Sequence, residues 1–383
     1  MKFTVERKVM FELLKSMIRI VPQQGPIPEL QGFLIEADEN DGCLYLTATN
    51  LECAIQRKYK TPVETGGGIV LKADLLLNIV ELLSGENIEF EKIRNGQVTI
   101  KCGSTVYTLP GYKAKAYPKP EIPFPEDTIK VSGWKELYGR TRPAVGKNEN
   151  KPALAGIHME ITAKGLRMSG CDLLRLSVAE KKMEVNGKTM SATLPRTSLS
   201  YLISAVGDDD TLEVGRCGSN FVFMKSGMLF STRIISGEYI NVEQLIHMVK
   251  SDYMAKVDYQ EFRSMILTVS TAAKLGTHTS LIKMELMEDQ IKLSTENDVS
   301  SGSSNAKAVV LKRTQDRTFY YSARMLLDAQ KIVSGDLILL ASETGYLLVI
   351  DSCGQYMLTP RREPKAVKQK NNQKKNKTEK KVA

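Results

Sequence analysis

The feature that most constrains the fold of this chain is a pattern that occurs three times at a nearly constant interval. "LYLTATNLECAI" begins at residue 44, "LRMSGCDLLRLS" at residue 166 and the more weakly similar "IKLSTENDVSSG" at residue 291. Each reads as a strand, a turn of polar residues and a returning strand. The intervals of 122 and 125 residues are far longer than the units of solenoid proteins, which run about 20–50 residues. The pattern therefore predicts three copies of a whole domain.

Two helix candidates recur in each third of the chain. The first kind lies at residues 5–21, 132–145 and 258–273, and the second kind at residues 73–85, 196–208 and 322–335. Their apolar residues fall at helical spacing, as with Met10, Leu13, Leu14 and Met17. The second kind ends on Gly85, Gly207 and Gly335, and glycine is the residue that a helix C-terminus prefers.

Strand candidates follow each second helix in the same order. They lie at residues 87–91, 211–215 and 337–341, and hairpin candidates with turns at Gly103, Gly227 and Gly354 come next. Each third thus reads as helix, strands, helix, strands, which predicts an α+β domain with two helices packed on antiparallel sheets. We place the domains at residues 1–126, 127–250 and 251–362, with a Pro-rich linker at 119–128 and the second boundary set by the period alone.

The positive charge of the chain lies mainly at its end. The formal net charge is +9, and residues 361–383 contain ten Lys or Arg against two Glu, so the rest of the chain is close to neutral. Residues 363–383 have no aromatic side chain and little that is apolar, which predicts a disordered basic tail. Such a tail is either a solvated extension or a mobile arm that touches nucleic acid phosphates.

No pattern in the sequence points to catalysis. The six cysteines and three histidines form no short-spaced cluster, so we expect reduced core thiols, no metal and no cofactor. There is no GxxxxGK[ST] phosphate loop, and the acidic run Asp208–Asp210 reads as a solvated turn rather than a metal site. No apolar run is long enough to cross a bilayer, and "MKFTVERKVMFELLK" lacks a signal-peptide core. These observations favour a cytoplasmic binding or scaffolding protein that is not an enzyme.

Several segments resemble the bacterial DNA polymerase III beta subunit, the replicative sliding clamp family. They are "MKFTVER", "PIPELQGFLIEA", "LTATNLE", "KPALAGIHME", "FSTRIISGEYINVEQLI" and "YMLTPRR". The resemblance covers residues 1–362 in the right order and includes all three repeats. It implies three tandem DNA-clamp domains in a chain that pairs head to tail with a second copy, giving a six-domain ring with helices lining the hole.

The resemblance also implies what such a ring does. It would encircle double-stranded DNA without sequence preference and give processivity to the replicative polymerase. Its partners would be a second copy of the chain, a clamp loader complex, and replicative and repair DNA polymerases, with no membrane involved. Sliding suits weak phosphate contacts that exchange easily.

The resemblance places functional residues at three locations. DNA-facing positions would be Lys8, Lys15, Arg19, Gln24, Arg140, Arg142 and Arg196. A pocket for a partner's peptide would be formed by Leu154, Cys171, Arg175, Leu176, Ile240, Leu245, Met357, Thr359, Pro360 and Arg361. For the leucines among them, an ordinary place in the domain core is the alternative.

At the dimer edge, Tyr107 and Leu109 would face Thr271 and Ala272 of the second copy. This is a small apolar contact, and the segment "NDVSSGSSN" offers little charge for ion pairing across the joint. We therefore expect a ring that opens more readily than most.

Two alternatives to the replicative clamp remain from the sequence. One is an enzyme whose site carries no recognisable motif. The other is a clamp paralogue, specialised or encoded on a mobile element, that serves a different polymerase or competes with the main ring.

Overall fold

The computed structural model describes residues 1–93, 96–146, 151–186, 188–247, 249–275, 280–297 and 299–363. They divide into two compact units. The first is Met1–Leu245 with Cys353–Gln355, and the second is Ile246–Ser352 with the residues from Tyr356 onward. The predicted boundary at residue 126 falls inside the first unit, so the division into three domains stays a prediction. Apart from Glu363, the predicted basic tail lies outside the described residues.

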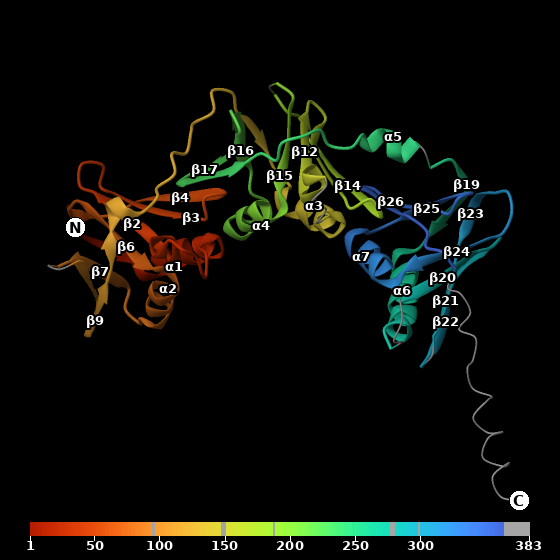
Figure 1. Cartoon of the computed structure of the whole chain (residues 1–383), viewed down its shortest axis with the longest axis horizontal. Helices are drawn as coiled ribbons and strands as arrows, with labels where there is room; N and C mark the ends of the chain where they lie inside the picture. The colour runs from red at the N-terminus through yellow and green to blue at the C-terminus, as the bar shows by residue number, and fades with distance from the viewer. Residues whose placement is uncertain are drawn as a thin grey trace, which may run out of the picture. The chain divides into compact units, whose positions relative to one another are not determined.

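Antiparallel sheets make up most of the first unit (Figure 1). A five-stranded sheet has the order β5 (Val63–Thr65), β1 (Lys2–Glu6), β7 (Asn87–Lys92), β8 (Gln97–Cys102), β9 (Thr105–Pro110). A nine-stranded sheet has the order β10 (Tyr112–Lys113), β6 (Gly67–Lys72), β2 (Gly32–Asp38), β3 (Cys43–Thr49), β4 (Cys53–Lys60), β18 (Met228–Arg233), β17 (Asn220–Lys225), β16 (Leu212–Cys217), β11 (Ile129–Val131). Four further strands are neighbours in the order β15 (Met190–Pro195), β12 (Gly156–Thr162), β13 (Gly165–Cys171), β14 (Arg175–Lys182).

Main-chain hydrogen bonds join the first and second thirds of the chain. In the nine-stranded sheet β4 pairs antiparallel with β18, so that Ile55 lies opposite Phe230 and Ala54 opposite Ser231. Because an antiparallel ladder satisfies the backbone donors and acceptors of both strands, the two thirds form one continuous sheet. This is why they belong to a single unit.

Four helices of the first unit cover its core. They are α1 (Arg7–Met17), α2 (Ala73–Leu82), α3 (Trp134–Thr141) and α4 (Arg196–Ala205). Helix α1 contacts both α2 and α4, and α3 packs on β13 and β14 (Figure 1). The apolar face of α1 buries Met10, Leu14 and Met17, as its spacing predicted. The Trp134 indole N–H donates to the Val131 carbonyl at 3.0 Å, which satisfies the polar group of this buried ring.

The second unit is likewise built from antiparallel sheets and helices. One set of strands has the order β27 (Gly354–Leu358), β26 (Leu347–Asp351), β25 (Leu337–Ser342), β19 (Ser251–Val257), β23 (Val309–Arg313). A four-stranded sheet has the order β22 (Ser301–Lys307), β21 (Gln290–Glu296), β20 (Leu281–Leu286), β24 (Arg317–Ser322). Helix α6 (Tyr259–Ala273) packs on α7 (Ala323–Ile332), β21 and β22. Asp258 caps the N-terminus of α6, because its carboxylate accepts from the backbone N–H groups of Gln260 and Glu261 at 2.8 and 2.9 Å.

Shorter helical segments complete the described chain. They are α5 (Val242–His247), η1 (Ile18–Ile20), η2 (Pro28–Gln31), η4 (Ala114–Ala116), η5 (Arg142–Ala144) and η6 (Pro152–Ala155). Within the described ranges, no helix is long and apolar enough to cross a membrane.

The repeated pattern in the sequence is a repeated turn in the structure. Asn50, Asp172 and Asn297 each follow a strand, and the side-chain oxygen of each accepts from the backbone N–H groups two and three residues later, at 2.8 to 3.1 Å. The backbone N–H of each also donates to the carbonyl three residues later. This Asx turn reverses the chain between β3 and β4, β13 and β14, and β21 and β22. The α+β fold with antiparallel hairpins in each third is therefore confirmed.

The predicted helix ends were wrong in detail. Val5 and Glu6 belong to β1, so the first helix starts at Arg7. The second helices end before their glycines, because Leu83, Val206 and Val333 adopt extended backbone at the C-cap. Glycine at residue 85 has a packing reason instead: a Cβ there would lie 2.5 Å from the Cys102 sulfur.

The cysteine prediction was right. All six thiols are free, with four buried and two half-buried.

Candidate functional site

Four predicted pocket residues of the first unit are mainly buried. Leu154 in η6, Cys171 at the end of β13, and Arg175 and Leu176 at the start of β14 expose no more than 8% of their surface. Asp172 fixes this corner, because its second carboxylate oxygen lies 3.0 Å from the Arg175 Nε while the first closes the Asx turn. Burial raises the pKa of the Cys171 thiol. The buried leucines thus have a place in the core, whatever partner surface lies near them.

The apolar surface of this corner is carried by two other leucines. Leu173 is 49% exposed and has a backbone φ of +69°, and Leu174 is 36% exposed. The left-handed backbone at the second position of the Asx turn directs both residues outward. The pocket that the family resemblance implies did not include them, although two adjacent leucines in a polar turn were the signal for them.

Ile240 and Leu245, both half-buried, lie on a segment that we call the strap, residues 235–245. The Tyr239 ring stacks on the His158 ring at a centroid distance of 4.8 Å, and the Tyr239 hydroxyl donates to the Ser169 carbonyl at 3.1 Å. Burial raises the pKa of Tyr239 and lowers the pKa of His158, so His158 is held neutral.

An ion-pair network fixes the end of the same strap at Glu243. The Arg167 guanidinium lies 2.6 Å from Glu243 on the strap, 3.1 Å from Glu180 on β14 and 3.8 Å from Glu160 on β12. One cation thus joins two strands and the strap. The strap positions Ile240 and Leu245 on the surface of the first unit.

The remaining pocket residues lie in the second unit. Met357 is buried in β27, and Thr359, Pro360 and Arg361 follow it half-buried. The Arg361 backbone N–H donates to the Tyr320 carbonyl at 2.7 Å, which holds this stretch against β24. A pocket that includes residues of both units stays a prediction.

The predicted DNA-facing residues lie on or beside helices of the first unit. Lys8, Lys15, Arg19, Gln24 and Arg142 are exposed, while Arg140 and Arg196 are half-buried. Arg140 lies 3.5 Å from Glu136 on the preceding turn of α3. Arg196 is the first residue of α4, and its carbonyl accepts from the Tyr138 hydroxyl at 3.4 Å.

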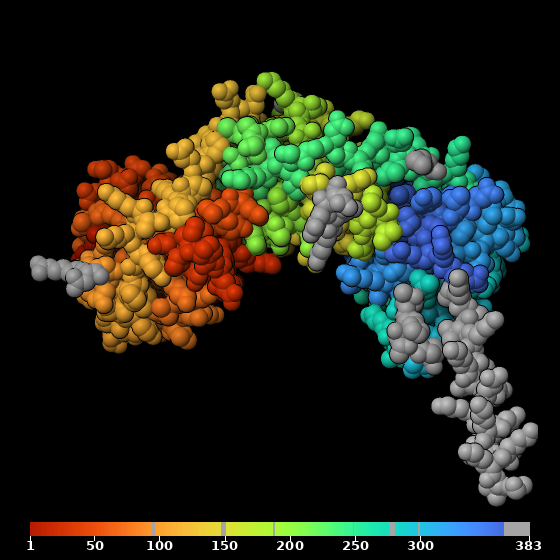
Figure 2. Space-filling model, in the orientation of Figure 1, coloured from red at the N-terminus to blue at the C-terminus, as the bar shows by residue number. Residues whose placement is uncertain are grey.

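Lys8 and Lys15 line a groove between α1 and α4, with a volume of about 590 Å³. On the face shown in Figure 2, the red surface of the first third meets the green surface of the second. We call the groove that Lys8 and Lys15 line the α1–α4 groove. Its lining consists of Lys8, Val9, Glu12, Leu13, Lys15 and Ser16 from α1, Ser204 and Ala205 from α4, the adjoining Val206, and Arg57 from β4.

Arg57 is a residue that sequence reasoning missed. Its Nη2 donates to the Ala205 carbonyl at 2.7 Å, at the C-terminal end of α4. Its Nε is buried and has no hydrogen-bond partner among the described residues. Burial lowers the pKa of Arg57, and Asp210 opposes that shift. The DNA-facing positions that the family resemblance implies do not include Arg57, whose signal in the sequence was the basic strand segment "IQRKYK".

The predicted dimer residues lie on strand β9, which carries Tyr107 and Leu109, and on the last turn of helix α6, which carries Thr271 and Ala272 and packs on strand β22. Strand β9 is at the edge of its five-stranded sheet and β22 at the edge of its four-stranded sheet. Tyr107 is half-buried and Leu109 is 8% exposed within the core, whereas Val106 is 55% exposed.

In the second unit, Thr271 is exposed, and the Ala272 carbonyl accepts from the Asn297 amide at 3.1 Å and the Ser300 hydroxyl at 2.8 Å. Leu267 on α6, Leu275 just after α6 and Val299 just before β22 are exposed apolar residues, and the family resemblance did not include them.

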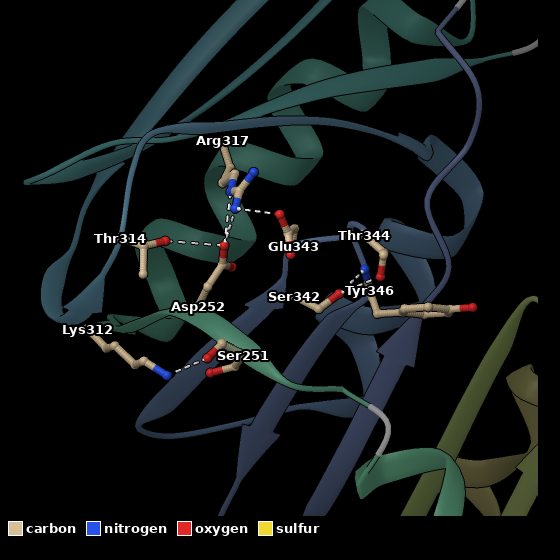
Figure 3. Close-up of polar contacts among 9 residues, drawn as sticks. All are labelled: Ser251, Asp252, Lys312, Thr314, Arg317, Ser342, Glu343, Thr344 and Tyr346. Carbon is tan, nitrogen blue, oxygen red and sulfur yellow. Dashed lines mark hydrogen bonds and ion pairs between the residues drawn. The ribbon is translucent and has the colours of Figure 1, made fainter.

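A polar cluster in the second unit holds the turn before β24 (Figure 3). Arg317 lies 3.0 Å from Asp252 through its Nε and 3.9 Å from Glu343 through its Nη2. The Thr314 hydroxyl lies 3.3 Å from the same Asp252 oxygen. Because these contacts link β19, β24 and the turn after β25, we assign the cluster a structural role.

The acidic run Asp208–Asp210 is a turn, as predicted. Asp210 accepts from the Gly207 backbone N–H at 2.7 Å and pairs with Lys225, and this hydrogen bond to Lys225 lowers the Asp210 pKa. Lys135 pairs with Asp208. Among the described residues, no group of His, Cys, Asp and Glu is arranged to hold a metal ion.

Comparison with known proteins identifies the family of this chain. Residues 1–122 match the model of the DNA polymerase III beta subunit, N-terminal domain, and residues 128–241 match that of its central domain. A beta sliding clamp from Bacillus subtilis is 25% identical over 359 residues, covering 88% of this chain and 91% of the relative. One from Micrococcus luteus is 25% identical over 311 residues, covering 79% of this chain and 98% of the relative.

Solved structures share the fold over nearly the whole chain. A putative DNA polymerase III beta subunit from Eubacterium rectale superposes with a TM-score of 0.88 at 18% identity, covering 95% of this chain and all of the other. The DNA polymerase sliding clamp from Bacillus subtilis gives a TM-score of 0.86 at 22% identity, with the same coverage. The shared fold therefore extends through the last third of the chain.

Proposed function

The chain belongs to the DNA polymerase III beta subunit family, and on that premise we propose that it is a DNA sliding clamp, a ring that encircles duplex DNA and keeps the replicative polymerase on its template. The observation that carries this proposal is the threefold hairpin with its Asx turn, on a fold shared with clamp structures over 95% of the chain. The protein acts by topology and has no catalytic step of its own.

The ring closes by pairing of free sheet edges. Strand β9 of one copy and β22 of a second copy are both unpaired along one side in the described chain. Edge strands present rows of free N–H and C=O groups, so antiparallel pairing between copies satisfies both. Tyr107 and Leu109 then face Thr271 and Ala272, with Val106, Leu275 and Val299 adding exposed apolar surface. Three domains per chain, at residues 1–126, 127–250 and 251–362, give six in the dimer.

The DNA-facing surface consists of the helices. Lys8, Lys15, Arg19, Arg142 and Gln24 offer exposed charges or amides to the phosphate backbone, with Arg140 and Arg196 beside them. Contacts of this kind are independent of base sequence and exchange readily, which suits a ring that must slide.

Polymerases and repair proteins dock through a peptide pocket. Leu154, Cys171, Arg175, Leu176, Ile240 and Leu245 form its wall in the first unit, and Met357, Thr359, Pro360 and Arg361 form the remainder. The exposed Leu173 and Leu174 supply apolar contact area at its rim, where a partner's hydrophobic anchors bind. A clamp loader places the ring on DNA in the cytoplasm.

A specialised paralogue is the second candidate. The curated relatives are named as beta sliding clamps, so we favour the replicative role.

Primer extension under single-encounter conditions tests the proposal. With a loader complex, ATP and the cognate replicative polymerase, the protein lengthens the products made in one binding event. A loader reaction without ATP is the control and leaves the products short. Product lengths that do not respond to the protein under either condition would contradict the proposed function.

A further inference from the structure

We propose that a small pocket beside the β3–β4 hairpin is a docking site for an extended segment of another protein. The segment would carry one apolar side chain of about leucine size next to a Lys or Arg. We call this site the first-hairpin pocket. Its lining comes from the hairpin around its turn, from residues 120–122 of the linker, and from β17 and β18, so it lies wholly within the first unit. It is separate from the peptide pocket proposed above.

The first-hairpin pocket has the same place in the first repeat as the proposed peptide pocket has in the second. Thr49 and Ala54 lie opposite each other at the end of the first hairpin, and both line the pocket. Cys171 and Leu176 lie opposite each other at the same place in the second hairpin, and the proposed peptide pocket includes both. This comparison rests on the proposed function, whereas the volume and the charges of the first-hairpin pocket do not.

The linker forms one wall of the pocket in a fixed position. The Tyr117 hydroxyl accepts from the Thr49 backbone N–H at 3.1 Å, much as the Tyr239 hydroxyl holds the strap on the second hairpin. Proline at residues 118 and 120 restricts the φ angles of this stretch. The wall formed by residues 120–122 is therefore in place before a ligand arrives, which reduces the entropy lost on binding.

The pocket has the size of one apolar side chain. Its volume is about 140 Å³, and a cavity of roughly 150 Å³ holds a benzene-sized group. Two exposed apolar side chains belong to the same segments. Leu51 in the turn is 48% exposed, and Phe124, two residues beyond the lining residue Ile122, is 73% exposed. Exposed apolar and aromatic surface beside a pocket is typical of a protein interaction site.

The charges at the pocket favour a basic segment. Glu52 and Glu121 line it and are exposed, and neither carboxylate forms an ion pair within the described chain. Glu52 has the turn position at which the second hairpin has Leu174, so the rim is acidic here and apolar there. Arg233 is the one cation of the lining, and its guanidinium offers donors to main-chain carbonyl groups. Two carboxylates against one guanidinium select a Lys or Arg beside the apolar side chain.

The basic end of this chain fits the pocket less well than a segment of a different protein. Residues 364–383 are rich in Lys but contain no apolar side chain larger than valine. A valine would leave part of the 140 Å³ volume unfilled, and the atoms lining an unfilled space lose their dispersion contacts. A leucine-sized side chain on another protein fills the pocket and keeps the basic neighbour.

Methyl NMR spectra of the full chain test the pocket. The probe is the acetylated and amidated pentapeptide Gly-Lys-Leu-Lys-Gly, titrated to millimolar concentration. The methyl signals of Leu51, Ala54 and Ile122 are expected to shift and to saturate. A peptide with Gly in place of Leu, and another with Glu in place of both Lys, should bind at least about tenfold more weakly. No saturable shift overturns the site, and equal binding of the Glu peptide overturns the assignment to a basic segment.

Charge variants of the protein locate the contacts. Glu52→Gln with Glu121→Gln should weaken binding of the probe about threefold to tenfold, because each exposed ion pair contributes little. Glu126→Gln with Glu184→Gln, two exposed carboxylates outside the lining, is the matched control and leaves the affinity unchanged. Leu51→Asn removes the apolar rim with a residue that tolerates positive φ, and it should also weaken the probe. A control pair that weakens binding as much as the pocket pair overturns the site.

Further spectra distinguish other occupants. Shifts of the same methyl signals with protein concentration, in the absence of peptide, would mean that a second copy occupies the pocket, and would overturn the assignment to a different protein. Tighter binding of a peptide of residues 364–383 than of the probe would overturn it in favour of this chain's own end. A clamp-motif peptide should leave these methyl signals unshifted, so failure of the first-hairpin pocket and failure of the proposed clamp function are observed separately.

Discussion

Asn50, Asp172 and Asn297 have the same role in three hairpins, and two of these turns place a leucine where leucine is disfavoured. Leu51 and Leu173 have φ values of +71° and +69°. The left-handed conformation costs a residue with a Cβ about 1–2 kcal/mol. The Asx hydrogen bonds on either side hold the backbone there.

Replacing Leu173 by glycine tests the strain directly. Glycine adopts positive φ freely but loses more entropy on folding, so Leu173→Gly should raise the free energy of unfolding by about 0.5–1 kcal/mol. Leu174→Gly is the control, because Leu174 has no positive φ, and it should lower stability. Urea denaturation measures both. If the two variants are destabilised alike, the turn stores no strain at Leu173.

Replacing the same leucines by aspartate tests the pocket. Leu173→Asp with Leu174→Asp should weaken binding of a clamp-motif peptide at least tenfold while leaving the fold intact, since both side chains are exposed. This is a cleaner variant than Leu176→Asp, which places a carboxylate at a position that is 1% exposed. The control is Leu51→Asp, the equivalent exposed position of the first repeat. Peptide affinity that Leu51→Asp lowers equally would argue against a pocket at Leu173.

At the scale of elements, the strap is the segment most dependent on a few contacts. Tyr239 stacks on His158, and Arg167 ties Glu243 to two strands. The groups that face His158 are Thr193, whose hydroxyl lies 3.0 Å from the ring, with Tyr239, Glu160 and Arg167. Residues 235–245 carry Ile240 and Leu245, so loss of these contacts would displace two residues of the proposed peptide pocket.

Acid should loosen the strap through His158. Its pKa is lowered in the folded protein, mainly by burial, from an unfolded value of about 6.5. Its contribution to stability is therefore complete above that pH and is lost as the pH falls through the depressed folded value. Urea midpoints at pH 7.5 and 5.0 should differ more for the parent than for His158→Gln. Equal differences would mean that His158 does not report on strap stability.

The helices and hairpins were predictable because their information is local. Helical spacing placed Met10, Leu14 and Met17 inward, and a polar residue after a strand placed each reversal. The glycine caps were not predictable, since Gly85 is retained by its closeness to Cys102, a residue of a distant strand. The position of Arg57 could not be predicted for the same reason. Its place at the end of α4 depends on the pairing of β4 with β18, which no local pattern specifies.

At the scale of the whole molecule, the proposed ring closes through the two edges β9 and β22. Leu109 is packed in the core of its own chain, and the Ala272 carbonyl accepts hydrogen bonds from Asn297 and Ser300. Little surface of these two residues therefore remains for the predicted contact with a second copy. Val106, Leu275 and Val299 are the exposed apolar residues that remain for it. The family resemblance named Tyr107, Leu109, Thr271 and Ala272 for this joint, which stays a prediction, whereas the exposure of each side chain required the structure.

A dimer with this edge should dissociate more readily than its relatives. Equilibrium sedimentation over a range from nanomolar to micromolar concentration should show monomer at the low end, with the Bacillus subtilis clamp as the comparison. Val106→Asp should shift the balance further toward monomer, because it places a charge on the exposed side of the edge strand. Absence of monomer even at nanomolar concentration would contradict the weak joint.

The most direct test of the central claim is whether the protein is held on DNA by topology. The protein is loaded onto nicked circular DNA with its loader and ATP, the circle is cut, and the bound fraction is measured at moderate salt before and after cutting. A ring that encircles DNA stays on the circle and is lost from the linear product. Equal retention on both forms would mean that electrostatic attraction holds the protein, and the account of a sliding ring would be wrong.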